Sequence, residues 1–108
     1  MIGIIFGFGS ETLEVRVMGN DVYFRTSQFM QFTTIDGLKL SKVGVIKEFP
    51  DLKGNDDWNK IAISRFKEKI KKMNNEKEAA EYLIEDLRKY GYKPLYMQKK
   101  GFRPQKLK

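Results

Sequence analysis

A β-hairpin decides the fold class, and its sequence over residues 12–26 is TLEVRVMGNDVYFRT. Leu13, Val15 and Val17 alternate with polar and charged residues, which is the period-two pattern of a strand that buries one face. The turn signal Gly19-Asn20-Asp21 follows, and residues 22–26 alternate in the same way. The segment therefore predicts two antiparallel strands joined by a tight turn.

Further strands are expected on both sides of this hairpin. Within residues 2–8, bulky apolar side chains alternate with Gly3, Ile5 and Gly7, so one face is nearly bare and would let a helix or a partner's backbone approach closely. Residues 27–35 are less regular and are expected to form a strand or a loop, with Asp36-Gly37 as a hairpin tip. Residues 92–98 predict a last strand, and Pro94 favours a sheet edge for it.

Three helices are expected in the second half of the chain. Ser41 caps the first, whose apolar positions are Val43, Ile46 and Phe49. Asp56 or Asp57 starts the second, and the third spans residues 76–90. The sequence thus predicts an α+β fold, in which an antiparallel sheet of three to five mostly N-terminal strands is packed by about three helices. Residues 1–98 are expected to form the domain, and residues 99–108 a basic, mobile tail.

The composition excludes several classes of chemistry. The 108 residues fit one domain and include neither cysteine nor histidine, which removes disulfides, thiolate chemistry and the usual general base. No segment is apolar over the roughly 18 residues of a membrane span. No basic residue precedes the apolar stretch 2–8, so it does not read as a signal peptide. We therefore expect a cytoplasmic protein with no cofactor, no metal and no membrane contact, and the abundant Lys, Glu and Ile suit a hot-adapted organism.

The net charge of +7 is concentrated at the C-terminal end. Residues 88–108 contain eight Lys and Arg and no acidic residue, whereas the rest of the chain has 13 basic and 14 acidic residues. Such asymmetry favours an anionic partner, with nucleic acid as the first candidate. The alternative is a solubilising tail on an ordinary domain. Lys99, Lys100 and Arg103 are the candidate phosphate contacts at this end.

Aromatic and basic residues are also interleaved elsewhere. Arg16, Tyr23 and Arg25 share the outward face of the hairpin, and two phenylalanines, Phe29 and Phe32, fall in a polar, irregular segment. An exposed sheet face of this kind can stack unpaired bases on its rings while Arg and Lys contact phosphates. The pattern predicts binding of single-stranded nucleic acid without sequence preference, with Arg65 and Tyr96 as further candidates. The competing interpretation is that helices cover this face and bury both phenylalanines.

Two other functions remain open. Asp51-Leu52-Lys53 has the acid-x-Lys spacing of metal-dependent nucleases, and the candidates for a second carboxylate are Asp36, Glu48, Asp56 and Asp57. Aspartates in these positions are equally typical of a turn and of a helix cap, so we expect a binding protein rather than an enzyme. The second alternative is a protein-interaction module whose basic end meets an acidic partner.

The order of elements resembles that of the ThermoDBP-related single-stranded-DNA-binding proteins of archaea. The resemblance covers residues 12–90 in general organisation and rests on Phe49-Pro50-Asp51-Leu52 after the strands, Asp57-Trp58 at the start of a helix, and Arg65-Phe66-Lys67 within it. It implies an apolar and aromatic cleft with basic flanks, which binds single-stranded DNA without sequence preference, and no catalytic residue. Larger relatives dimerise through a C-terminal helical segment. No heptad run follows Tyr90 here, so a homodimer of this chain would need another interface.

Overall fold

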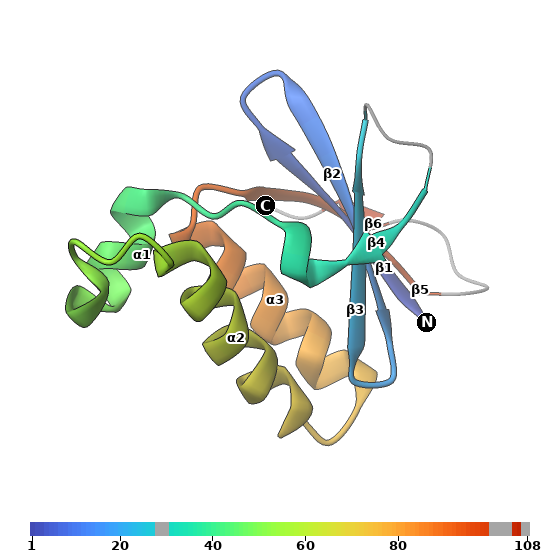
Figure 1. Cartoon of the computed structure of the whole chain (residues 1–108). Helices are drawn as coiled ribbons and strands as arrows, with labels where there is room; N and C mark the ends of the chain where they lie inside the picture. Colours follow the sequence, from blue (N-terminus) through green and yellow to red (C-terminus); the bar gives the residue numbers. More distant parts are fainter. Residues whose placement is uncertain (28–30, 100–104, 107–108) are drawn as a thin grey trace.

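The computed structural model describes residues 1–27, 31–99 and 105–106, which form a sheet with helices packed on one of its faces (Figure 1). The α-helices are α1 (Lys42–Glu48), α2 (Trp58–Lys71) and α3 (Glu76–Lys89). Two short 3-10 helices are η1 (Ile35–Gly37) and η2 (Pro50–Leu52). The strands are β1 (Ile2–Phe8), β2 (Glu11–Met18), β3 (Asp21–Thr26), β4 (Thr33–Thr34), β5 (Lys93–Lys99) and β6 (Gln105–Lys106).

The strands form one antiparallel sheet in the order β4-β3-β2-β1-β5-β6. The expected hairpin is β2–β3, with Val15 paired to Phe24 and Arg16 paired to Tyr23. The chain then passes through the helices and returns as β5 on the other side of β1. The α+β class, the mostly N-terminal antiparallel strands and the three helices are confirmed. The described residues add two two-residue strands, β4 and β6, at the sheet edges.

The core lies between the helices and one face of the sheet. Ile4, Phe6, Val15 and Val17 are completely buried on this inner face, because alternate residues of β1 and β2 point toward the helices. The third helix packs against them with a stripe of small and aliphatic residues at helical spacing: Ala79, Ala80, Leu83 and Leu87. Burying each of the larger side chains stabilises the fold by about 1.5–3 kcal/mol.

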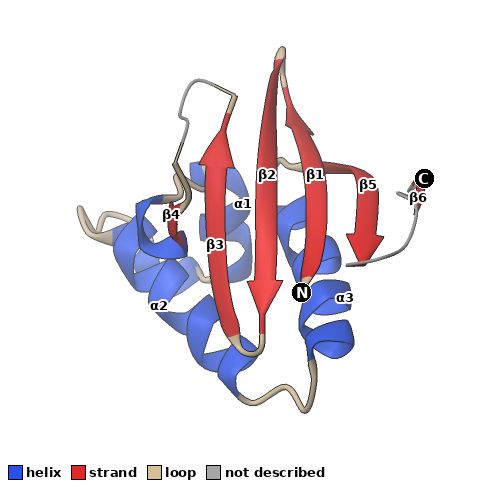
Figure 2. Ribbon diagram, turned by 90° about the vertical axis from the view of Figure 1, so that its right-hand side faces the viewer, coloured by secondary structure: helices blue, strands red, loops and turns tan. Residues whose placement is uncertain are grey.

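The opposite face of the sheet, which we call the outer face, carries no described helix (Figure 2). Figure 2 views it directly, with β3, β2, β1 and β5 in front of the helical layer. The sequence left open whether helices cover both faces, and in the described chain they cover one. The outer face is formed by the remaining alternate residues: Gly3, Ile5 and Gly7 of β1, Thr12, Glu14 and Arg16 of β2, Tyr23 and Arg25 of β3, and Lys93 and Tyr96 of β5.

The first helix begins as predicted but buries a different residue. The Ser41 hydroxyl accepts a hydrogen bond from the Gly44 N–H at 3.4 Å, so the predicted cap is confirmed. Val45 is buried, whereas the expected core residue Val43 is 81% exposed. The reason is the contact of α1 with the end of α3: a Cβ at Gly44 would overlap the carbonyl oxygen of Lys89. The side of α1 that carries the glycine therefore packs against α3, and this orientation turns Val43 to solvent.

Three other local expectations need correction. Asp36 and Gly37 belong to η1 and are not the tip of a hairpin. Asp57 precedes α2, but its side chain makes no cap hydrogen bond; instead its own N–H donates to Asn55 Oδ1 at 2.8 Å. The end of the chain, expected as a tail from residue 99, includes the last residue of β5 and the strand β6, whose backbone pairs with Tyr96 and Met97.

Candidate functional site

Strand register arranges the outer face in cross-strand rows. One row runs from Tyr23 through Arg16 to Gly3, and the next runs from Arg25 through Glu14 and Ile5 to Tyr96. Residues directly opposite on paired strands have Cβ atoms about 5 Å apart, so neighbours within a row are in contact range. The rows thus place aromatic rings at both sides of the face and charged groups between them.

The phenyl ring of Phe32 lies against two guanidinium groups of the outer face. The Arg16 Cζ is 4.1 Å from the ring centroid, and the Arg25 Cζ is 4.7 Å from it. Both distances fit cation–π contacts, which contribute about 0.5–1 kcal/mol each at exposed sites. The ring is therefore a constituent of the outer face and is not buried beneath helices, contrary to the competing interpretation of the sequence.

Glu14 pairs with both arginines. Its Oε1 accepts from Arg25 Nη2 at 2.9 Å and from Arg25 Nε at 3.1 Å, and its Oε2 accepts from Arg16 Nε at 3.3 Å. This carboxylate was not among the expected site residues, although its position between the arginines follows from the register. The two arginines with Glu14 carry one net positive charge. Arg16 uses only its Nε in the described contacts, so its terminal nitrogens face no described acceptor.

On the far side of the outer face, the structure describes the side chains of Ile5, Tyr96 and Lys93. Tyr96 is 45% exposed and lies opposite the partly buried Ile5. Lys93 lies opposite Gly7, is exposed, and makes no described ion pair. The space beside Gly7 is taken by Leu95, whose Cδ1 would lie 3.3 Å from an added Cβ. Lys93 was not anticipated as a site residue, because the bulge that sets the register of β5 is invisible in the sequence.

Arg65 does not belong to this face. It projects from α2 in the helical layer, where it forms a two-pronged ion pair with Asp51 at 2.7 and 3.2 Å. Its guanidinium also lies 4.9 Å from the ring centroid of Phe49. Hydrogen bonding to Arg65 lowers the pKa of the Asp51 carboxyl. We therefore remove Arg65 from the candidate interface: its charge is already matched, and it lies on the other layer of the molecule.

The remaining candidates fall at the limits of the described chain. Phe29, Lys100 and Arg103 lie outside the described residues. The backbone of Lys99 pairs with Ile2 at the end of β5, which places this residue at the margin of the sheet. Of the predicted set, the structure thus brings four residues together with Tyr96 across the same face: Arg16, Tyr23, Arg25 and Phe32.

The carboxylates of the nuclease alternative do not converge. Asp51 pairs with Arg65, and Asp36 pairs with Lys67 at 2.9 Å, which lowers the pKa of the Asp36 carboxyl through that hydrogen bond. Glu48 lies near Lys89, at 3.7 Å. Among the described residues, no group of three or more acidic, His or Cys side chains is close enough to hold a metal ion. Among the described residues, the acid-x-Lys spacing is therefore not accompanied by a cluster of three such side chains.

The sequence also did not predict that a carboxylate on α3 would be buried. Asp86 is 5% exposed, accepts a hydrogen bond from the Tyr82 hydroxyl at 2.8 Å, and pairs with Lys89 at 3.4 Å. The charge of Asp86 raises the pKa of Lys89, and burial together with the hydrogen bond to Asp86 raises that of Tyr82. These contacts satisfy the carboxylate within the helical layer, so its role is structural.

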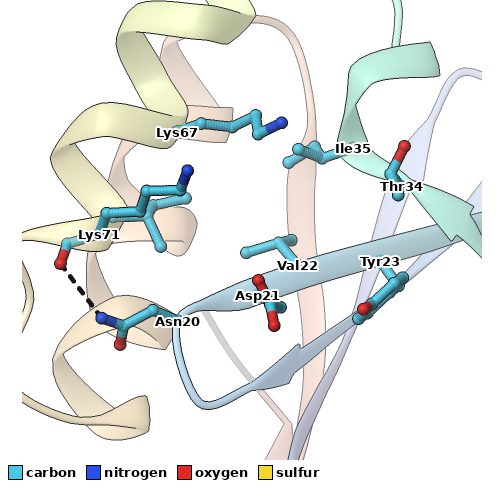
Figure 3. A pocket seen from close by; sticks show the side chains of 9 residues that line it. Asn20, Asp21, Val22, Tyr23, Thr34, Ile35, Lys67 and Lys71 are labelled. Carbon is cyan, nitrogen blue, oxygen red and sulfur yellow. Dashed lines mark hydrogen bonds between the residues drawn. The ribbon is translucent and has the colours of Figure 1, made fainter.

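A small cavity of about 70 Å³ lies between α2 and β3 (Figure 3). Figure 3 shows Lys67 and Lys71 on the helix, Asn20 in the β2–β3 turn and Asp21 at the start of β3. Lys67 is paired with Asp36, and the Asn20 side chain donates to the Lys71 carbonyl oxygen at 3.1 Å. The cavity volume is too small for a nucleotide, and Asp36 matches the charge of Lys67.

No helix among the described residues is long and apolar enough to cross a membrane.

The chain matches no protein-family model, no curated protein and no solved structure. The resemblance to the ThermoDBP-related proteins therefore stays a prediction, and the outer face has to be interpreted from its own chemistry.

Proposed function

We propose that this chain binds single-stranded DNA, without sequence preference, across the outer face of its sheet. The observation that supports the proposal most directly is the combination of Tyr23, Phe32 and Tyr96 with Arg16 and Arg25 on a face that no described helix covers. Single-strand-binding surfaces in general combine aromatic rings, on which bases stack, with cations that follow the phosphates.

The spacing of the rings suits several nucleotides. Tyr23 and Tyr96 lie on β3 and β5, which are separated by β2 and β1. Three inter-strand spacings of about 4.8 Å place their backbones roughly 14 Å apart. Each stacked base contributes about 1–3 kcal/mol without requiring a particular sequence.

The cations divide into two groups in this proposal. Arg16 and Arg25 hold Phe32 in place, Arg16 offers its terminal N–H groups to phosphates, and the exposed Lys93 contacts the backbone on the other side. The basic C-terminal end, with Lys99, Lys100 and Arg103, adds phosphate contacts without base preference. The net charge of +7 supports such an electrostatic contribution.

The test is a titration of a labelled mixed-sequence single strand at several salt concentrations. Each neutralised phosphate contributes about −0.7 to the slope of log affinity against log salt, so four or five contacts give a slope near −3. Double-stranded DNA and an RNA strand of the same sequence are measured in parallel, and we expect the single-stranded DNA to bind most tightly.

Variants locate the binding surface. Tyr23→Ala and Tyr96→Ala should each weaken binding about tenfold, because each removes one stacking platform. Val43→Ala is the matched control, since Val43 is exposed on α1 in the helical layer. Absence of binding at low salt, or equal losses in all three variants, contradicts the proposal.

A further inference from the structure

A second cavity opens at the end of the sheet where β1 and β3 finish and β2 begins. Its volume is about 650 Å³, within the range of roughly 300–1,000 Å³ that is usual for small-molecule sites. The inner-face residues Leu13 and Phe24 form one wall, and the segment 37–40 forms the other. The cavity lies at the edge of the helical side of the sheet, so it is distinct from the outer face, although Arg25 lines its rim.

Aromatic rings form the floor of this cavity. Phe8 and Tyr92 lie with their ring centroids 4.9 Å apart, at an interplanar angle of 34°. Phe8 is 46% exposed, which is unusual for a ring so close to the core, and its exposed surface faces the open cavity. Apolar surface that stays exposed inside a concave site is favourable for binding an apolar ring, because the ligand removes it from water.

The second wall is held in place by hydrogen bonds from distant elements. The Tyr92 hydroxyl donates to the Lys39 carbonyl oxygen at 2.6 Å. Asn59 of α2 fixes the neighbouring residues: its Oδ1 accepts from the Leu40 N–H at 2.7 Å, and its Nδ2 donates to the Leu38 carbonyl oxygen at 3.0 Å. The cavity is therefore preformed, and a ligand need not order this segment on binding.

Charges at the rim indicate what kind of ligand fits. Lys39 is exposed, lines the cavity, and makes no ion pair among the described contacts. Arg25 also lines it but pairs with Glu14, and Glu11 is the acidic residue of the lining. The lysine is thus the cation at the rim with no described acidic partner, above an apolar and aromatic interior.

We propose that this cavity binds a small amphipathic anion, an apolar ring system that carries one carboxylate or sulfonate. The ring would lie on Phe8 and Tyr92, and the acidic group would face Lys39 at the rim. This ligand site lies at the helical side of the sheet and shares Arg25 with the proposed strand-binding face.

A pair of fluorescent probes tests both parts of the proposal. Anilinonaphthalene sulfonate has the proposed chemistry, and phenylnaphthylamine has nearly the same rings without the acidic group. We expect both probes to bind the folded protein with enhanced fluorescence and one-to-one stoichiometry. Backbone amide shifts in a nuclear magnetic resonance titration should move at Phe8, Phe24 and Tyr92.

Two variants test separately the burial of the ligand's rings in the cavity and the attraction of its acidic group to Lys39. Gly37→Leu fills the cavity: a Cβ at Gly37 lies 3.7 Å from Phe24 Cζ, an ordinary contact, and the rest of the side chain extends into the space. It should weaken both probes at least tenfold. Lys39→Glu should weaken only the sulfonate, by roughly three- to tenfold, as expected for reversing one exposed charge. Lys60→Glu, an exposed lysine of α2, is the matched charge control and should change neither probe.

The results for these variants distinguish binding in the cavity from binding elsewhere. Circular dichroism establishes that each variant is folded, and Lys39→Glu keeps the charge test informative even where Gly37→Leu fails to fold. Probe binding that survives in folded Gly37→Leu, or equal losses in Lys39→Glu and Lys60→Glu, overturns the proposal. Gly37→Leu should leave DNA binding unchanged, and joint loss of probe and DNA binding would show that the cavity is part of the strand-binding surface instead.

Discussion

Removing the charge of Glu14 should strengthen DNA binding. Glu14→Gln keeps the size and shape of the side chain but removes a carboxylate that lies 2.9 Å from Arg25 and 3.3 Å from Arg16. Two unit charges 4 Å apart interact by about 1 kcal/mol in bulk water. That value is appropriate here because the arginine side chains are 39% and 37% exposed. Relieving repulsion of this size between Glu14 and a phosphate corresponds to roughly fivefold tighter binding.

The assay is the same salt-dependent titration, with Glu68→Gln as the control. Glu68 is exposed on α2, so its substitution changes the net charge of the protein by the same amount in the helical layer. We expect Glu14→Gln to increase affinity and to steepen the salt slope by about 0.7, the value for one additional phosphate contact. Its stability should fall by at most about 1 kcal/mol, because surface ion pairs contribute little. Equal effects of the two variants, or no gain in Glu14→Gln, would refute the assignment of the outer face.

The other predictions concern the packing of the helices and are measured by urea denaturation. Gly44→Ala should lower the free energy of unfolding by about 1–3 kcal/mol, because the added Cβ overlaps the Lys89 carbonyl oxygen. This loss outweighs the gain of about 1 kcal/mol in helix propensity. Gly37→Ala should be close to neutral, because its Cβ makes only an ordinary contact. Asn75→Ala should lower the free energy of unfolding by about 1 kcal/mol, because the Asn75 Oδ1 accepts from the Glu78 N–H at 2.9 Å at the start of α3. Asp57→Ala should lower it little, because the Asp57 side chain makes no cap hydrogen bond. A stable Gly44→Ala protein would mean that α1 is not packed against α3 as described, and equal losses in the two cap variants would mean that Asp57 does cap α2.

The approximate positions of the longer elements were predictable because their signals are local. Alternation of Val15 and Val17 with Glu14 and Arg16 requires only the two-residue repeat of a strand. Ser41 caps α1 through a bond to a residue three positions later. Asp57, by contrast, has the right residue type for a cap in the right place, yet its side chain makes no cap hydrogen bond and its own N–H donates to Asn55 Oδ1.

The candidate site was predictable only where it lies on one hairpin. Arg16, Tyr23 and Arg25 are joined by a tight turn, so the alternation of two adjacent strands already places them on one face. Tyr96 and Lys93 join them through the pairing of β1 with β5, which brings together residues some 90 positions apart in the sequence. A bulge shifts that register, and no local pattern encodes it. Arg65 failed as a candidate for the same reason, since its ion-pair partner Asp51 lies on a separate element, η2, and only the fold brings the two side chains together.

By itself the sequence determined the α+β class, the absence of cysteine and histidine chemistry, and the concentration of positive charge at the C-terminal end. These follow from composition and from periodicities of two and 3.6 residues, which are properties of the chain before it folds. Only the tertiary structure decided that the helices leave the outer face uncovered, that Glu14 joins two arginines beneath Phe32, and that Gly44 sets the approach of α1 to α3. Each of these depends on contacts between segments distant in sequence, and such contacts are selected by the packing of the whole core.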